Sequence, residues 1–279
     1  MNTATFKIWR TQPEGDGTYQ TFHTEVSDGM VVLDAVHRIQ ADQAPDLAVR
    51  WNCKAGKCGS CSAEINGKPR LMCMTRLNTL NLLEPVTVEP MRAFPPIKDL
   101  VTDVSWNFRV KKSIRKFKVK PKEADGTWRV KQRDIDRVQE FRKCIECFLC
   151  QDVCHILRDH KMHDKFIGPR FVTYAAALEM NPLDAADRLP ELKEQHGIGY
   201  CNITRCCTKV CPEHITITEN AIIPLKERHG IGYCNITRCC TKVCPEHITI
   251  TENAIIPLKE RVVDRFYDPL TRLLRVFKS

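Results

Sequence analysis

The chain has 279 residues, a formal net charge of +9 and sixteen cysteines. Its length allows a sizeable core and favours two domains. It lacks an apolar run of 18 residues and an N-terminal secretory pattern, so we expect no transmembrane segment and no signal peptide. The cysteines are therefore expected to be reduced, metal-binding thiols rather than disulfides. The basic residues match no nucleic-acid motif, which favours an acidic partner or an anionic membrane surface.

The first hundred residues predict a small sheet domain with one helix. Residues 5–9 and 18–26 have strand patterns and are joined by a polar turn at 14–17. Residues 32–39 place apolar side chains at i, i+3, i+4 and i+7, which predicts an amphipathic helix. A hairpin over 63–71, turning at Asn66 and Gly67, and a strand at 86–88 complete the prediction. This order favours a β-grasp domain over residues 1–100, ending in a proline-containing linker.

Four cysteines in this domain have the plant-type [2Fe–2S] spacing. Three lie within nine residues and the fourth follows eleven residues further on: Cys53, Cys58, Cys61 and Cys73. Gly56 and Gly59 lie between them, and glycine lets a backbone curl around a cluster with its amides facing sulfur. A structural zinc site is the alternative, but zinc ligands usually come as two separated pairs.

Residues 101–279 predict a second, all-α domain. The stretch 109–122 is rich in Lys and Arg and is expected to be a solvated surface, with docking to an acidic partner as the alternative. Apolar residues at 135, 138 and 141 lie on one helical face that leads into the next cysteine run. A helix is predicted from Phe171 to Leu178, after Gly168 and Pro169. Thr216 to Glu219 has the form of a capping box before another helix.

Two cysteine runs in this second domain are expected to share the ligands of two clusters. The first comprises Cys144, Cys147, Cys150 and Cys154, and the second comprises Cys201, Cys207 and Cys211. In the bacterial ferredoxin pattern, three closely spaced thiolates hold one cluster and the fourth cysteine of the run reaches the other cluster. We therefore predict a [4Fe–4S] cluster on Cys144, Cys147, Cys150 and Cys211. Cys154, Cys201 and Cys207 would hold the other cluster.

Thr204 occupies the position at which this other cluster would need its fourth thiolate. A hydroxyl is a poor iron ligand beside thiolates, so the pattern favours a [3Fe–4S] cluster. Cys206 is an additional thiol, either a spare ligand or, as we expect, a buried and inert cysteine. Histidine ligation, as in Rieske centres, is an alternative for nearby histidines such as His155, but eleven cysteines already account for three clusters.

The segments 196–228 and 229–261 are identical in sequence. Stable repeat arrays need three or more units, so a recent duplication or an error in the recorded sequence is the expected origin. The second copy repeats the ligand pattern as Cys234, Cys240 and Cys244, and these are the alternative ligands. We favour the first copy because it closes the shorter loop to Cys154. The tail that follows alternates basic and apolar residues, as in a membrane-surface helix or an ordinary terminal helix.

The three cysteine motifs together resemble those of the iron–sulfur subunits of succinate dehydrogenase and fumarate reductase, over residues 1 to about 228. The sequence Arg50-Trp51-Asn52-Cys53 also resembles the first-cluster loop of that family. The resemblance implies an electron-transfer subunit of the respiratory chain and tricarboxylic acid cycle. Its partners would be an FAD-bearing flavoprotein and a membrane anchor, with haem as an optional group on a partner. It implies a peripheral location on the cytoplasmic face of the cell membrane.

Members of that family that reduce ubiquinone usually have Pro and Trp after the fourth cysteine of the first run. This chain has His155 and Asp159 in that region, and Asn202 where a histidine is usual. We therefore assign no quinone-binding residues, and the departures are compatible with menaquinone. Quinol:fumarate reduction is the reverse alternative, and an iron–sulfur subunit of another flavin-linked dehydrogenase is a further one. A zinc or nucleic-acid binding protein is the non-redox alternative.

Overall fold

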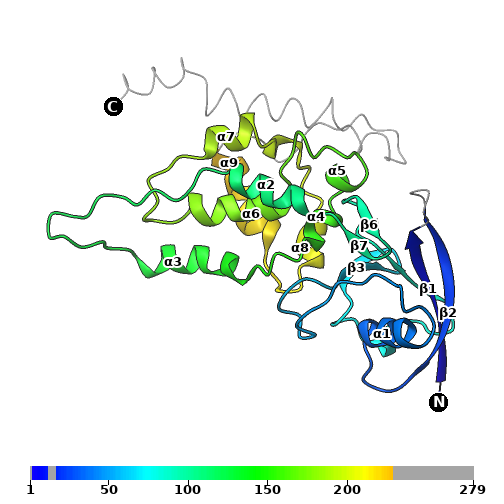
Figure 1. Cartoon of the computed structure of the whole chain (residues 1–279). Coiled ribbons are helices and arrows are strands. Elements are labelled where there is room, and N and C mark those ends of the chain that lie inside the picture. The colour runs from blue at the N-terminus through cyan, green and yellow to red at the C-terminus, as the bar shows by residue number, and fades with distance from the viewer. Residues whose placement is uncertain (1, 12–16, 229–279) are drawn as a thin grey trace, which may run out of the picture. The chain divides into compact units, whose positions relative to one another are not determined.

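The computed structural model describes residues 2–11 and 17–228. The predicted turn at 14–17 lies mostly outside these residues. The alternative ligands Cys234, Cys240 and Cys244, the second repeat copy and the C-terminal tail also lie outside them. Figure 1 shows a sheet with one helix in the N-terminal part, followed by a succession of helices.

The N-terminal part is built on a five-stranded mixed sheet with strand order β2-β1-β5-β3-β4. Its first two strands are antiparallel over their whole length, whereas β5 pairs with β1 in parallel. The strands are β1 (Asn2–Thr11), β2 (Gly17–Val26), β3 (Ser62–Ile65), β4 (Lys68–Leu71) and β5 (Val86–Glu89). The predicted strands and the hairpin are confirmed. At the hairpin turn Asn66 and Gly67 have φ values of 49° and 69°, as a type I′ turn requires.

Helix α1 (Val32–Asp42) covers one face of this sheet. Its predicted apolar stripe is buried, and in β1 the buried Ala4, Phe6 and Ile8 alternate with more exposed residues. Asp34 accepts a hydrogen bond from the Val31 amide at the helix start. The 3.6-residue and two-residue periods therefore bury matching faces against each other.

The predicted linker after β5 is not simply a linker, and this part of the prediction is wrong. Residues 96–102 form a small hairpin of β6 (Pro96–Lys98) and β7 (Val101–Thr102). Asp99 at its tip is fully buried and accepts hydrogen bonds from the amides of Thr11 and Ala48. A buried carboxylate with amide donors ties this segment to the sheet, and proline content alone could not indicate it.

The second part is helical, as predicted. The α-helices, with their bounds, are α2 (Ser105–Ser113), α3 (Gln132–Gln139), α4 (Leu149–Asp152), α5 (His155–Arg158), α6 (Gly168–Glu179), α7 (Leu189–Glu194), α8 (Cys206–Val210) and α9 (Ile223–Arg228). Shorter 3₁₀ turns are η1 (Leu77–Thr79), η2 (Glu140–Lys143) and η3 (Ile198–Tyr200), and η4 (Ile217–Ile222) is a π-helical turn. The helix predicted over Phe171 to Leu178 is confirmed, but α6 already begins at Gly168, with Pro169 in its first turn.

The predicted capping box at Thr216 to Glu219 is wrong. Thr216 makes no side-chain cap, and its amide instead donates to the Glu140 carboxylate at 2.6 Å. Glu219 pairs with Arg205, with Nε and Oε1 3.2 Å apart. Partners that are distant in the sequence therefore satisfy both side chains that the local motif would have joined.

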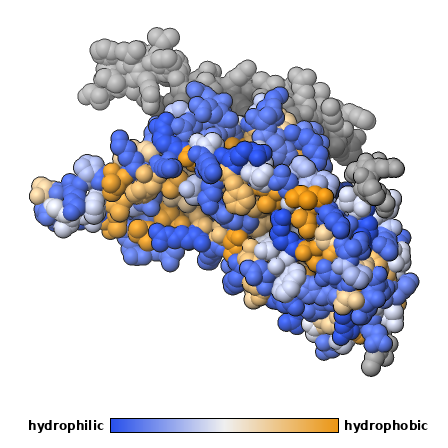
Figure 2. Space-filling model, viewed as in Figure 1, coloured by the Kyte–Doolittle hydropathy of each residue, from blue (hydrophilic) through white to orange (hydrophobic). Residues whose placement is uncertain are grey.

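Residues 115–122 of the predicted basic stretch are exposed, as expected, whereas Val110 and Ile114 at its start are buried, because 109–113 belong to α2. Figure 2 shows hydrophobic surface mainly over the helical part, whereas the surface of the sheet is largely hydrophilic. Within the described residues, no helix has the length and apolar character that a bilayer crossing would require.

Candidate iron–sulfur centres

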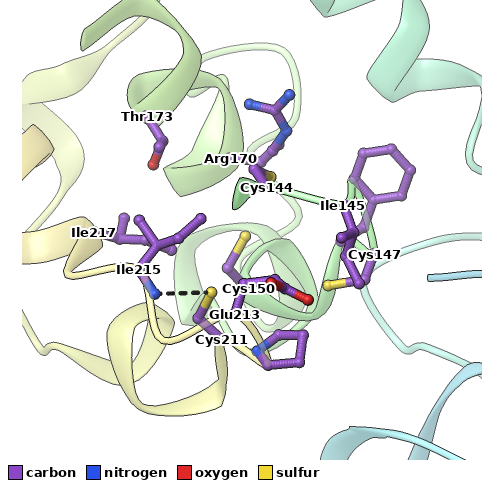
Figure 3. Close-up of a pocket in the computed structure, with 12 residues that line it drawn as sticks. Cys144, Ile145, Cys147, Cys150, Arg170, Thr173, Cys211, Glu213, Ile215 and Ile217 are labelled. Carbon is purple, nitrogen blue, oxygen red and sulfur yellow. Dashed lines mark hydrogen bonds between the residues drawn. The ribbon is translucent and has the colours of Figure 1, made fainter. Parts of the chain in front are cut away.

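The first helical centre is a pocket lined by the four thiols that the sequence predicted for one cluster. Cys144 and Cys147 lie in the loop before α4, Cys150 lies in α4, and Cys211 lies directly after α8. Figure 3 shows sulfur atoms from these separate segments around a common space. Ile145, Phe148, Ile215 and Ile217 supply an apolar wall. The structure therefore brings residues 144–150 and 211 together as predicted.

The second helical centre gathers Cys154, Cys201 and Cys207 in one pocket. Thr204 lines the same pocket, as do Cys206 and His155. Cys206 is half-buried, and its thiol lies 3.8 Å from the Thr204 carbonyl oxygen. The expectation that Cys206 is buried is therefore wrong: as the first residue of α8, it lines this pocket and remains partly exposed.

The loops that carry the two runs have the same backbone conformation. Glu146 and Phe148 have positive φ values of 55° and 61°, and Ile203 and Arg205 have 59° and 63° at the equivalent positions. A short helix begins after the second of these residues in each loop, α4 in one and α8 in the other. Positive φ is costly for non-glycine residues, so this repeated feature indicates a functional constraint. Thr204 takes the place in its loop that Cys147 takes in the other.

The third group of thiols comprises Cys53, Cys58 and Cys61 in the loop between α1 and β3, and Cys73 just after β4. The amides of Ala55 and Lys57 donate to the Cys53 sulfur at 3.4 Å and 3.3 Å. Burial raises the pKa of Cys61 to about 12, and the nearby thiols of Cys73 and Cys58 add to this rise. Gly56 and Gly59 have φ values of 67° and 69°, in agreement with the predicted curled backbone.

The segment that carries Cys58 and Cys61 touches the loop that carries Cys147. A Cβ atom added to Gly59 would lie 2.6 Å from the Cys147 Cα. Ser62 Oγ donates to the Cys147 carbonyl oxygen at 2.8 Å, and Lys57 Nζ lies 3.1 Å from a carboxylate oxygen of Glu213. Glycine at position 59 is thus required both for its φ and for this close approach.

Burial makes these thiols reluctant to ionise in the metal-free chain. It raises the pKa of Cys147 and Cys154 to about 12 and that of Cys207 to about 11. Cys58 differs: burial opposes its ionisation, but hydrogen bonds from Ser60 and Cys53 lower its pKa to about 6. Bound iron would supply the positive charge that stabilises the thiolates, at the cost of releasing protons.

Backbone amides are already directed at the sulfur atoms. The Ile215 amide donates to Cys211 Sγ at 3.4 Å (Figure 3). Amides of Leu149 and Leu157 similarly stabilise the ionised forms of Cys147 and Cys154. Such donors compensate the negative charge of an iron–sulfur cluster, so the residues present fit the groups that the cysteine spacing predicts.

Comparison with known proteins agrees with this fit. Residues 5–109 match the family described as a 2Fe-2S iron–sulfur cluster binding domain, and residues 140–215 match the 4Fe-4S dicluster domain. The fumarate reductase iron–sulfur subunit of Mycobacterium tuberculosis is 32% identical over 222 residues, which are 77% of this chain and 88% of that subunit. The chain belongs to the iron–sulfur subunits of fumarate reductase and succinate dehydrogenase.

Two further comparisons support the membership. The succinate dehydrogenase iron–sulfur subunit of Coxiella burnetii is 29% identical over 218 residues, 76% of this chain and 91% of that subunit. A chain in the solved Mycobacterium smegmatis Sdh1 complex in the apo form is 57% identical, with a TM-score of 0.78, and the match covers 82% of this chain and 95% of that one. This iron–sulfur subunit is thus an electron-transfer component of an oxidoreductase complex.

The zinc alternative has no support in the geometry of this iron–sulfur subunit. Among residues 2–11 and 17–228, no three His, Cys, Asp or Glu side chains are arranged to hold a single metal ion. Thiols around one zinc ion must all lie within about 2.3 Å of it, whereas thiols around a cluster stand further apart because irons and sulfides fill the centre.

Sequence reasoning missed the charged groups that surround the thiols. Arg170 lines the first helical pocket, and its guanidinium lies 2.6 Å from the Glu146 carboxylate. Burial opposes ionisation of Glu146, but hydrogen bonds from Lys111 and Arg170 keep its pKa below the usual value. Arg158, four residues after Cys154, pairs at 2.8 Å with the fully buried Glu64 of β3. The only indication of these contacts in the sequence is the presence of charged residues within apolar stretches.

Proposed function

We propose that this iron–sulfur subunit passes electrons singly between the FAD of a partner flavoprotein and a membrane quinone. The three thiol groups would hold [2Fe–2S], [4Fe–4S] and [3Fe–4S] clusters in that order along the path. The observation that carries the proposal is contact in series. Gly59, in the loop before β3, and Ser62, the first residue of β3, touch Cys147. Helices α4 and α8, which follow the backbone turns at Phe148 and Arg205, pack together.

The ligand assignment follows the two helical pockets and, for the remaining four cysteines, their spacing in the sequence. Cys53, Cys58, Cys61 and Cys73 would hold [2Fe–2S], and Cys144, Cys147, Cys150 and Cys211 would hold [4Fe–4S]. Cys154, Cys201 and Cys207 would hold the third cluster. Thr204 supports a three-iron form there, because it stands where the neighbouring loop has a thiol and a hydroxyl binds iron poorly beside thiolates. The β-grasp domain over 1–100 and the ferredoxin-type helical domain after it remain part of this proposal.

The clusters would supply one-electron chemistry when bound. The chain itself orients the thiols, compensates their charge and excludes water. Phe148 and Ile217, with 7% and 2% of their surface exposed, shield the first helical pocket. Low solvent access and amide donors are two ways in which a protein sets a cluster potential.

The partners are proposed from family membership. The flavoprotein would oxidise succinate, and a membrane anchor would hold this subunit on the cytoplasmic face of the membrane, with menaquinone as a candidate acceptor and haem as an optional group on the anchor. Succinate oxidation is the favoured direction because the 57% identical solved chain comes from an Sdh1 complex. Fumarate reduction is the second candidate, since the 32% identical relative is a fumarate reductase subunit.

EPR spectroscopy of the purified complex, with and without succinate, tests the proposal. We expect three distinct iron centres and reduction of at least one of them by succinate. Metal analysis should find iron and acid-labile sulfide in the same preparation. Fewer than three centres in the intact complex would contradict the electron path, and zinc without sulfide would exclude it.

A further inference from the structure

A basic groove lies between the sheet and the helices of this iron–sulfur subunit. It is lined by the turn and strand of the β3–β4 hairpin, by residues 74–79, and by parts of α4 and α8. Its volume is about 710 Å³, enough for several side chains of another molecule. None of the proposed ligands lines the groove, which adjoins the first helical pocket at Pro212 and shares no residue with the second.

The charge of this groove is one-sided. Lys68, Arg70, Arg76 and Lys209 line it together with Arg158, and no acidic side chain does. Arg158 is paired with Glu64, whereas the other four cations form no ion pair with any side chain of residues 2–11 or 17–228. Lys68, Arg76 and Lys209 are exposed. Clustered cations without counter-charges create a positive potential that attracts an acidic ligand.

The floor of the groove is apolar. Leu71, Leu149, Val153 and Val210 line it between the cations. Met74 lies at one margin with 59% of its surface exposed. A Cβ on Gly56 would meet the Met74 side chain at 2.9 Å, so the groove is continuous with the loop that carries Cys53 and Cys58. An apolar centre with a charged rim is the usual anatomy of a protein interface.

We propose that the groove receives an acidic segment of the flavoprotein partner, with carboxylates that flank an apolar side chain. The inference rests on the proposed function, which supplies the partner. A bilayer surface is too broad to reach a floor that lies between a hairpin and two helices, which favours a polypeptide over lipid headgroups. A segment held here would also position the flavoprotein beside the loop that carries Cys53 and Cys58.

The test compares two charge-reversed double variants of the cluster-loaded subunit. Lys68→Glu with Lys209→Glu changes the groove. Lys112→Glu with Lys131→Glu makes the same change of net charge at exposed residues outside it. We expect the groove variant to bind the purified flavoprotein at least about tenfold more weakly, because like charges across an interface are strongly unfavourable. The control should change the dissociation constant by less than about twofold, since its charges stay in water.

Further measurements keep the outcomes distinct. EPR of each variant shows whether its clusters are intact, so loss of the electron path itself is seen separately from loss of docking. Lys68→Ala with Lys209→Ala should weaken binding less than the reversal and make it less sensitive to salt. Equal weakening by groove and control variants would overturn the proposal. Unchanged flavoprotein binding by the groove variant would also overturn it. Loss of binding to phosphatidylserine vesicles, or of self-association in light scattering, would then show that the groove binds lipid or a second copy of the subunit.

Discussion

The loops 144–154 and 201–211 share the same backbone features but lie in different surroundings. Both have positive φ at the same two positions and both lead into a short helix. They differ at one corner, where the first has Cys147 and the second has Thr204. The comparison teaches that the backbone sets where a ligand stands, while a single side chain decides how many thiolates the cluster receives.

The helices that follow the loops differ as well. Asp152 in α4 is fully buried, and its carboxylate accepts a hydrogen bond from the Ala93 amide at 2.9 Å. Lys209, at the equivalent position of α8, is exposed on the basic groove. Burial raises the pKa of Asp152 to about 7. The first loop is thus embedded between the two parts of the chain, whereas the second borders a free surface.

Cys147→Thr should have the largest effect, because it gives the 144–154 loop the threonine that the 201–211 loop has at the equivalent position. We expect the centre to lose about one iron per chain and to show a three-iron EPR signal. Iron analysis and EPR of the oxidised protein measure the change. Cys206→Thr, the same substitution at a residue outside the proposed ligands, is the control and should leave the iron content unchanged. An unaltered spectrum of Cys147→Thr would contradict its assignment as a ligand.

Thr204→Cys makes the opposite change in the second loop. The added thiolate should convert the three-iron centre toward a cube, with a gain of about one iron per chain and a weaker three-iron signal. Cys206→Ser in the same background tests whether the neighbouring thiol contributes. A three-iron signal of unchanged intensity would show that Thr204 does not occupy the empty corner.

Arg158→Met tests the contact that ties the end of the 144–154 loop to the sheet. Glu64 is fully buried, so removal of its closest cation should lower the free energy of unfolding by about 3 kcal/mol. Arg92→Met is the matched control: Arg92 lies 3.4 Å from Glu64, but its side chain is 50% exposed, and the cost should be about 1 kcal/mol. Chemical denaturation of the cluster-loaded subunit measures both. Equal costs would mean that burial of the pair does not stabilise this contact.

Gly59→Ala tests the contact between the loop before β3 and Cys147 of the 144–154 loop. Gly59 and Gly67 both have a φ of 69°, but a Cβ at Gly67 would meet nothing within 4 Å. Gly67→Ala should therefore cost about 1 kcal/mol from its backbone conformation alone. Gly59→Ala should cost about 1–2 kcal/mol more, because its Cβ would collide with Cys147. Similar thermal midpoints for the two variants would argue against the close approach.

Much of the site could be predicted because its determinants are local. The spacing of Cys144, Cys147 and Cys150 places their thiols around one curled loop, whatever the rest of the chain does. The hairpin at Asn66 and Gly67 follows from residues that accept positive φ. The stripe of α1 follows from its own period. Each of these predictions needed only residues that are neighbours in the sequence.

Only the tertiary structure decided which distant groups meet. The Thr216 amide donates to Glu140 rather than to Glu219, which a local capping box would have used. Glu64 of the sheet pairs with Arg158 of the helical part. The position of the two ligand loops, the partial exposure of Cys206 and the basic groove likewise depend on long-range contacts. Long-range contacts depend on packing of whole faces, and a buried charge stays where a partner satisfies it, so no local pattern encodes these pairs.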